Sequence, residues 1–162
     1  MSANADGLAS GDVGNDVKTD DFVTVYIADQ LFGIPVLEVQ DVLRHEQIGR
    51  IPMTPPEIAG SLNLRGRIVT AINVRQRIGL EEREGTTQQT SVVVDHHGEL
   101  YALVVDKVGE VMTMPEAAFE KNPATLDPLW RSVSSGIYQL EGRLLVVLDV
   151  IRLLDFSVEA AA

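Results

Sequence analysis

Several features are missing from this sequence, and each absence removes a class of structure or chemistry. No cysteine occurs among the 162 residues, which excludes disulfides, thiolate metal sites and cysteine nucleophiles. No apolar run approaches the roughly 18 residues of a membrane-spanning helix. The first residues also lack the basic and apolar regions of an export signal. We therefore expect a cytoplasmic chain that does not insert into a membrane.

Basic and aromatic residues are scarce. Thirteen lysines and arginines face 24 aspartates and glutamates, so the formal net charge is −11, and aromatic residues make up only 5%. Binding to nucleic acid depends on cations for the phosphates and on aromatic rings for stacking. A nucleic-acid function is therefore not expected. The 45% hydrophobic content is still enough to build one mainly aliphatic core.

Sequence patterns that carry catalytic chemistry are equally hard to find. The sequence holds no glycine-rich phosphate loop and no G-x-S-x-G motif. Its one dense group of potential ligands is Asp95-His96-His97, but Gly98 follows directly, and this favours a hairpin tip over a metal or acid–base site. His45-Glu46 is interpreted as a surface pair. We expect no catalytic residue, no cofactor and no metal.

Short β-rich runs dominate the chain and are broken by turn-forming residues. They cover residues 22–27, 31–36, 67–73, 91–94, 100–105 and 143–148. Two stretches, 73–80 and 149–156, have helical spacing and begin with Asn73 and Asp149, which suit helix N-caps. The prediction is an all-β fold with short helices that close the ends of small barrels.

The sequence also contains an internal duplication. Residues 32–42 align with 101–111, and residues 60–74 align with 136–150, so that Gly60 matches Gly136 and Arg67 matches Arg143. Two β-barrel units at about 22–80 and 91–156 are predicted. Each is too small to bury a robust core alone, so we expect one tightly packed body across residues 20–156. Whether the units exchange strands stays open.

Both ends of the chain are poor in core-forming residues. Residues 1–19 are rich in Gly, Ala, Ser, Asn and Asp, and such a composition cannot bury enough apolar surface to offset the entropy lost on ordering. They are predicted to form a flexible acidic tail. Residues 157–162 are expected to be a short C-terminal tail.

Arginine is concentrated in one part of this acidic chain. Residues 44–83 hold seven arginines against four glutamates. Guanidinium groups pair well with carboxylates and keep their charge when partly desolvated. Two interpretations stay open, a binding patch for acidic partners and an ordinary solvated surface. The arginines are Arg44, Arg50, Arg65, Arg67, Arg75, Arg77 and Arg83.

Three motifs, taken in order, resemble a known family. They are FGIPVLEVQDV at 32–42, IPMTPPEIAG at 51–60 and NLRGRIVTAINVR at 63–75. Together they are similar to the CheW family of chemotaxis coupling proteins, over about residues 21–156. The resemblance implies two SH3-like five-stranded β-barrels and a non-catalytic adaptor. It also implies three partners: the regulatory domain of the histidine kinase CheA, the cytoplasmic tips of methyl-accepting chemoreceptors, and further CheW copies in rings.

The resemblance carries four residues of the receptor and kinase coupling region onto this chain: Val39, Asp41, Gly60 and Arg65. Val39 is expected either to line a hydrophobic groove or to belong to the core. Gly60 is expected to serve a backbone conformation, binding, or both. The family pattern places Arg65 beside the acidic residue at 41, so we expect an Asp41–Arg65 ion pair. Asp41 stands where glutamate is frequent, so the shorter side chain has to reach further.

Two alternatives of different kinds remain. An adaptor of the same family could serve a kinase array with another output, such as pili or development. A small β-barrel of another class could bind an oligonucleotide or oligosaccharide through a concave face. The kinase-facing residues cannot be assigned from motifs.

Overall fold

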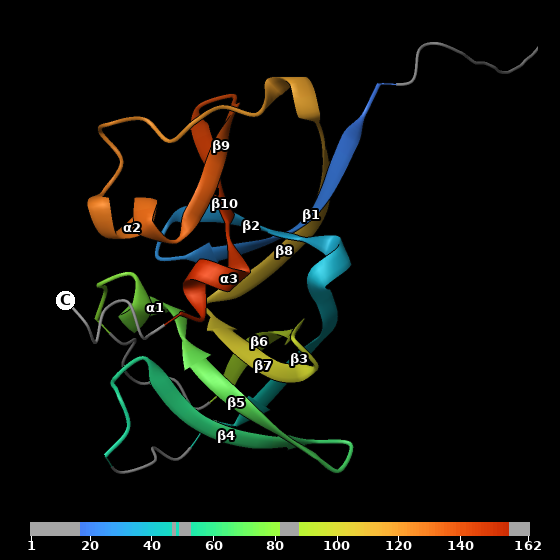
Figure 1. Cartoon of the computed structure of the whole chain (residues 1–162), viewed down its shortest axis with the longest axis vertical. Helices are drawn as coiled ribbons and strands as arrows, with labels where there is room; N and C mark the ends of the chain where they lie inside the picture. Colours follow the sequence, from blue (N-terminus) through green and yellow to red (C-terminus); the bar gives the residue numbers. More distant parts are fainter. Residues whose placement is uncertain (1–16, 47, 49–52, 82–87, 156–162) are drawn as a thin grey trace, which may run out of the picture.

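The computed structural model describes residues 17–46, 48, 53–81 and 88–155, and it consists of β-strands with a few short helices (Figure 1). The predicted fold class is confirmed. Five of the six predicted runs lie within strands, and the sixth, 31–36, ends one residue beyond its strand. Both predicted helices form, as α1 and α3. The elements are β1 (Thr19–Ile27), β2 (Gln30–Pro35), η2 (Val36–Glu38), β3 (Val39–Glu46), β4 (Ile58–Leu64), β5 (Arg67–Asn73), α1 (Val74–Arg77), β6 (Gln88–His96), β7 (Glu99–Val105), β8 (Lys107–Pro115), η3 (Glu116–Ala118), α2 (Pro128–Ser132), β9 (Ser134–Leu140), β10 (Arg143–Leu148) and α3 (Val150–Leu153).

The strands form two five-stranded sheets with the same internal order. Sheet 1, in the upper half of Figure 1, has the order β8-β1-β2-β10-β9, and sheet 2, below it, has β3-β6-β7-β5-β4. In the duplicated sequence, strands β1 to β5 correspond in order to strands β6 to β10. When each strand of sheet 1 is replaced by its counterpart, the strand order of sheet 2 results. Two pairings join the halves of the chain in each sheet: the antiparallel pairs β1–β8 and β3–β6, and the parallel pairs β2–β10 and β5–β7. Each sheet therefore combines strands from both sequence repeats.

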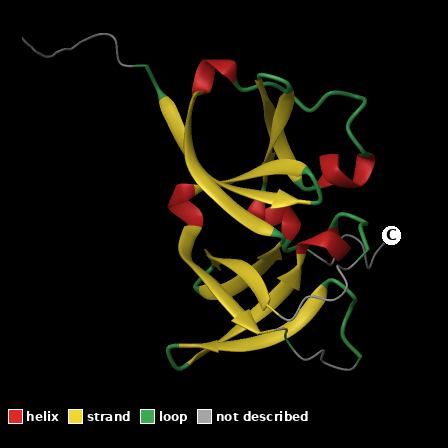
Figure 2. Cartoon of the chain, turned by 180° about the vertical axis from the view of Figure 1, so that it is seen from behind, coloured by secondary structure: helices red, strands yellow, loops and turns green. Residues whose placement is uncertain are grey.

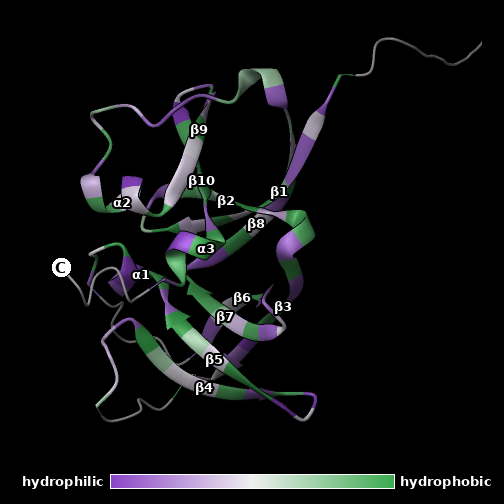
Figure 3. Cartoon of the chain, in the orientation of Figure 1, coloured by the Kyte–Doolittle hydropathy of each residue, from purple (hydrophilic) through white to green (hydrophobic). Residues whose placement is uncertain are grey.

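Alternate residues of the central strands enter different hydrophobic clusters. Along β7, Leu103 and Val105 join a core that also contains Phe32 and Val146 of sheet 1, whereas Ala102 and Val104 pack into a cluster confined to sheet 2. Successive strand residues point to opposite faces, so both faces of the strand are buried. Hydrophobic colour follows β5 and β7 in Figure 3, while the β4–β5 turn is hydrophilic. The core shared by the two sheets makes them one body.

The helices α1 and α3 lie between the two sheets (Figure 2). Asn73 accepts a hydrogen bond from the backbone N–H of Gln76 at 3.4 Å, and Asp149 accepts one from that of Arg152 at 3.2 Å. These are the predicted N-caps. Val74 and Val150 at the first helical positions belong to the shared core. Across the described ranges, none of the helices has the length and apolar character needed to span a membrane.

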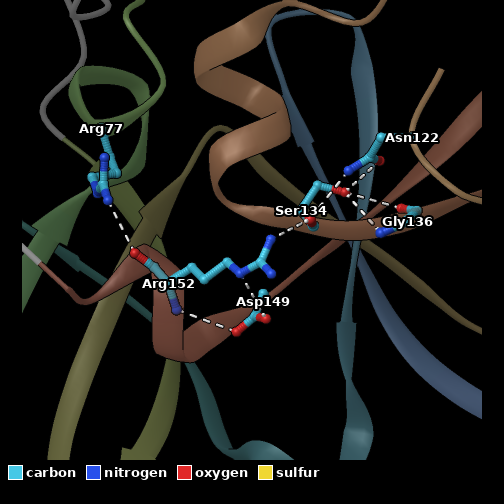
Figure 4. A network of polar contacts seen from close by, with 6 residues as sticks. All are labelled: Arg77, Asn122, Ser134, Gly136, Asp149 and Arg152. Carbon is cyan, nitrogen blue, oxygen red and sulfur yellow. Dashed lines mark hydrogen bonds and ion pairs between the residues drawn. The ribbon is translucent and has the colours of Figure 1, made fainter. Parts of the chain in front are cut away.

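A polar network ties α1 to α3 and β9 at this junction (Figure 4). Arg77 is buried and donates from Nε to the carbonyl of Leu153 at 2.9 Å and from Nη2 to that of Arg152 at 3.0 Å. Arg152 in turn donates to the carbonyl of Ser134 at 3.4 Å. The last carbonyls of a helix have no partner within the helix. Arg77 therefore satisfies the end of α3 from the opposite repeat.

The shared core predicts that the two sheets unfold together. Leu103 is fully buried in that core, so Leu103→Ala is expected to lower the free energy of unfolding by about 2–5 kcal/mol. Native-state hydrogen exchange on amides of β1 and β6 should show the same decrease in both sheets. Leu37→Ala, at a 96% exposed position, is the control and should change little. A decrease restricted to sheet 2 would contradict a common core.

Candidate functional site

Asp41 and Arg65 form an ion pair between the edge strand β3 and the β4–β5 turn of sheet 2. Arg65 Nη2 lies 3.0 Å from Asp41 Oδ2, and the side chains are 79% and 27% exposed. Arg65 occupies the β4–β5 turn with φ +53°, followed by Gly66 with φ +84°. Such positive angles are typical of tight hairpin turns. The predicted pair is confirmed, and the shorter carboxylate of aspartate reaches Arg65.

A β-bulge separates Val39 from Asp41. Val39 pairs with Val94, but Asp41 pairs with Val93, so Gln40 is the extra residue in β3. Directly opposed residues share a face of the sheet. Val39 consequently points to the shared core, against which it packs partly buried, while Asp41 lies on the other face. The bulge thus lets one strand carry a core residue and an ion-pair residue two positions apart.

Gly60 lies inside β4 and is buried. Its φ is +147°, and the register of β4 against β5 shifts between Ile58 and Gly60. Side chains rarely adopt this backbone angle, so glycine is required here by the bend of the strand. Gly136, its counterpart in β9, has φ +159°. The repeated conformation favours a structural role for Gly60, five residues along the chain from Arg65.

Glu38, the residue before Val39, is an acid whose pKa is shifted by its surroundings. Burial raises the pKa of Glu38 above its ordinary value, the nearby charge of Asp149 raises it further, and His96 opposes the shift. Glu38 belongs to η2 and Asp149 to the N-cap of α3. Sequence inspection did not single out Glu38, because its neighbours come from distant parts of the chain. The hairpin predicted at His96-His97 is confirmed, with His97 at φ +55° and Gly98 at +83° in the turn.

The arginine-rich stretch does not form one binding patch. Arg75 pairs with Asp106 through Nε–Oδ1 at 2.8 Å and Nη2–Oδ2 at 2.6 Å, and the hydrogen bond to Asp106 raises the pKa of Arg75. Arg77 is buried at the helix junction. These two side chains hold the fold together, and Arg44, Arg65 and Arg67 point to solvent. Arg50 and Arg83 lie outside the described residues.

Comparison with known proteins identifies the family. The family model described as the CheW-like domain matches residues 21–157. The chain belongs to the CheW-like family. A chemotaxis protein CheW from Klebsiella aerogenes is 29% identical over 154 residues, which cover 94% of this chain and 89% of that protein. One from Helicobacter pylori is 26% identical over 129 residues, covering 80% and 78%.

A solved structure supports the same assignment. The crystal structure of the scaffolding protein TtCheW from Thermoanaerobacter tengcongensis superposes with a TM-score of 0.71 at 28% identity, and the match covers 81% of this chain and 89% of that one. The fold and the chemotaxis coupling adaptor role predicted from the motifs are confirmed. Neither alternative, another kinase output or a nucleotide- or sugar-binding barrel, is favoured. The CheW-like family is a family of scaffolds.

Glu38 offers a test of the electrostatics around this CheW-like face. An acid whose pKa is raised in the folded state binds more protons than in the unfolded state, so its ionisation lowers stability as pH rises above the unfolded pKa. Glu38→Gln is therefore expected to stabilise the protein at pH 7, and the gain should vanish below the ordinary value of 4.5. Urea unfolding across this range measures it. Glu141→Gln, at an exposed hairpin, is the control. A gain that is independent of pH would show that the charge of Glu38 is not its cause.

Proposed function

We propose that this chain couples the tips of methyl-accepting chemoreceptors to the regulatory domain of the histidine kinase CheA, in cytoplasmic arrays and without catalysing a reaction. The observation that carries the proposal is the exposed Asp41–Arg65 pair at the hairpin of sheet 2. Membership of a scaffold family and similarity to TtCheW support it. Further copies of the chain in rings are part of the same proposal.

The energy of the pair indicates a role in binding rather than in folding. An ion pair exposed to this degree contributes only about 0–1 kcal/mol to stability. Arg65 is nevertheless held in a defined place, because the turn fixes its backbone and Asp41 fixes its guanidinium. Asp41 is itself oriented, since its Oδ1 accepts a hydrogen bond from the N–H of Val42 at 2.8 Å. An orientated, always charged side chain is suited to select a partner with acidic groups.

Apolar side chains on the same face as Asp41 would supply contact area. Leu43, two residues after Asp41 in β3, and Leu62 in β4 pack partly buried against the cluster of sheet 2. We propose that Val39 supports the coupling region from the other face of β3, where it packs on the shared core, and that Gly60 provides the bend of β4 that shapes it. A surface of this kind binds each partner weakly, and an array with several contacts per molecule raises the overall affinity.

The decisive variant is Arg65→Ala. It removes the orientated cation, so it is expected to weaken binding to a chemoreceptor tip fragment by about fivefold, the equivalent of about 1 kcal/mol. The melting temperature should hardly change. Calorimetry with the tip fragment and with the CheA regulatory domain, a receptor-coupled kinase assay and a thermal melt measure these effects.

Arg67→Ala provides the matched control. Arg67 is an exposed arginine on the same hairpin, and it donates to the carbonyl of Gly98 at 3.3 Å rather than to an acid. It should leave coupling nearly intact. The proposal fails if Arg65→Ala binds both partners like the unmodified protein, or if its loss of coupling merely follows a loss of folding.

A further inference from the structure

A groove of about 540 Å³ opens on sheet 1, where β1 begins and β2 ends. Its floor includes Phe22, Tyr138 and Val147, which belong to the hydrophobic cluster confined to this sheet. Its volume is within the range of about 300–1,000 Å³ that is usual for binding pockets. The groove lies on a different sheet from the Asp41–Arg65 pair.

The equivalent place in sheet 2 carries different side chains. Phe22 pairs with Pro35 and Met112, and its counterpart Ser91 pairs with Val104 and Leu43 in the corresponding registers. There His45 approaches Ser91, with Nε2 and Oγ 2.7 Å apart, and Ile48 packs against the neighbouring cluster. The two related places of one duplicated fold therefore differ in their side chains, with an aromatic ring at the floor of the groove in sheet 1 and a serine in contact with a histidine in sheet 2.

Two large apolar side chains at the edge of the groove are exposed to solvent. Leu37 in η2 is 96% exposed, and Phe119 after η3 is 41% exposed while its ring packs on Tyr138 with centroids 5.4 Å apart. Both line the groove. Exposed apolar groups gathered around one hollow are typical of an interaction site.

The rim of the groove is acidic. Asp20, Asp21 and Glu116 line it, and its lining contains no lysine or arginine. Asp20 and Glu116 are close enough to act on the floor, because after burial their charges are the further causes that raise the pKa of Tyr138. The local potential is therefore negative around an apolar hollow.

We propose that this groove is a second docking site, which takes a short segment of a partner protein in which apolar side chains are flanked by lysine or arginine. Apolar groups of the segment would cover Phe22 and Tyr138, and its cations would meet Asp20 and Glu116. Charge complementarity specifies the occupant. A second copy of this chain is a poor occupant of this groove in particular, because the acidic rim would meet a chain with a net charge of −11.

A designed peptide tests the chemistry directly. The probe is acetylated and amidated Gly-Arg-Leu-Phe-Arg-Gly, titrated into the full ¹⁵N-labelled chain. Saturable amide shifts are expected at Phe22, Leu37 and Phe119, with a Kd of about 0.1–1 mM for so short a segment. The peptide with glutamate in place of arginine and the one with serine in place of leucine and phenylalanine should both bind at least about tenfold more weakly.

Variants of exposed residues locate the site without risk to the core. The double variant Asp20→Lys/Glu116→Lys and the single variant Leu37→Ser are each expected to weaken peptide binding by about tenfold. Their matched controls, Glu141→Lys and Ile151→Ser, alter exposed residues that do not line the groove and should bind normally. Arg65→Ala should also bind the peptide normally, so this result is separate from the coupling proposal.

Three outcomes would overturn the inference. They are equal binding of the acidic peptide, amide shifts centred on Asp41 and Arg65, and equal losses in the control variants. Sedimentation velocity adds a fourth. Concentration-dependent self-association that Asp20→Lys/Glu116→Lys abolishes would make a second copy of this chain the occupant.

Discussion

The structure depends on one constraint, which is that the central strands of the sheets are buried on both faces. Leu103 and Val105 face a core shared with Phe32 of the other sheet, and the intervening Ala102 and Val104 face a cluster of their own. A sheet taken alone would expose the shared face to water. The parallel pairs β2–β10 and β5–β7 then make each sheet a product of both repeats, so neither half of the sequence can form its sheet independently.

This arrangement brings polar groups of both repeats together between the two sheets. Arginine side chains donate hydrogen bonds to the carbonyl and carboxylate groups there. Arg77 of α1 donates to the carbonyls of Leu153 and Arg152 in α3, and Arg75 pairs with Asp106 between β7 and β8. A guanidinium can do this because it offers several donors in a fixed plane. Arginines that composition alone suggested for partner binding are consequently part of the fold.

The duplicated frame carries two different surfaces. Arg65 at the hairpin of sheet 2 corresponds to Glu141 at the hairpin of sheet 1, and Ser91, in contact with His45, corresponds to Phe22 at the floor of the groove. Backbone features are repeated, as the positive φ angles of Gly60 and Gly136 show. Side chains have diverged. One scaffold can in this way offer unlike sites to unlike partners, which is the requirement for an adaptor that works through contacts alone.

Local signals in the sequence determined the elements that local physics governs. Strands 67–73 and 143–148 follow from their β-rich runs, the caps Asn73 and Asp149 from short side chains that accept backbone N–H groups, and the turn at Arg65-Gly66 from glycine. The motifs determined the family. Strands β3, β4 and β8 were not picked out by their runs of residues, because many of their side chains are exposed or only partly buried. Strand β9 is mostly buried, but it begins with Ser134, Ser135 and Gly136, which are not typical of a strand. The tertiary structure alone decided which strands pair in parallel, that Arg77 is buried, that the bulge at Gln40 turns Val39 inward, and that one cluster opens into a groove. These features join residues far apart in the chain, and their energies depend on packing that no single segment contains.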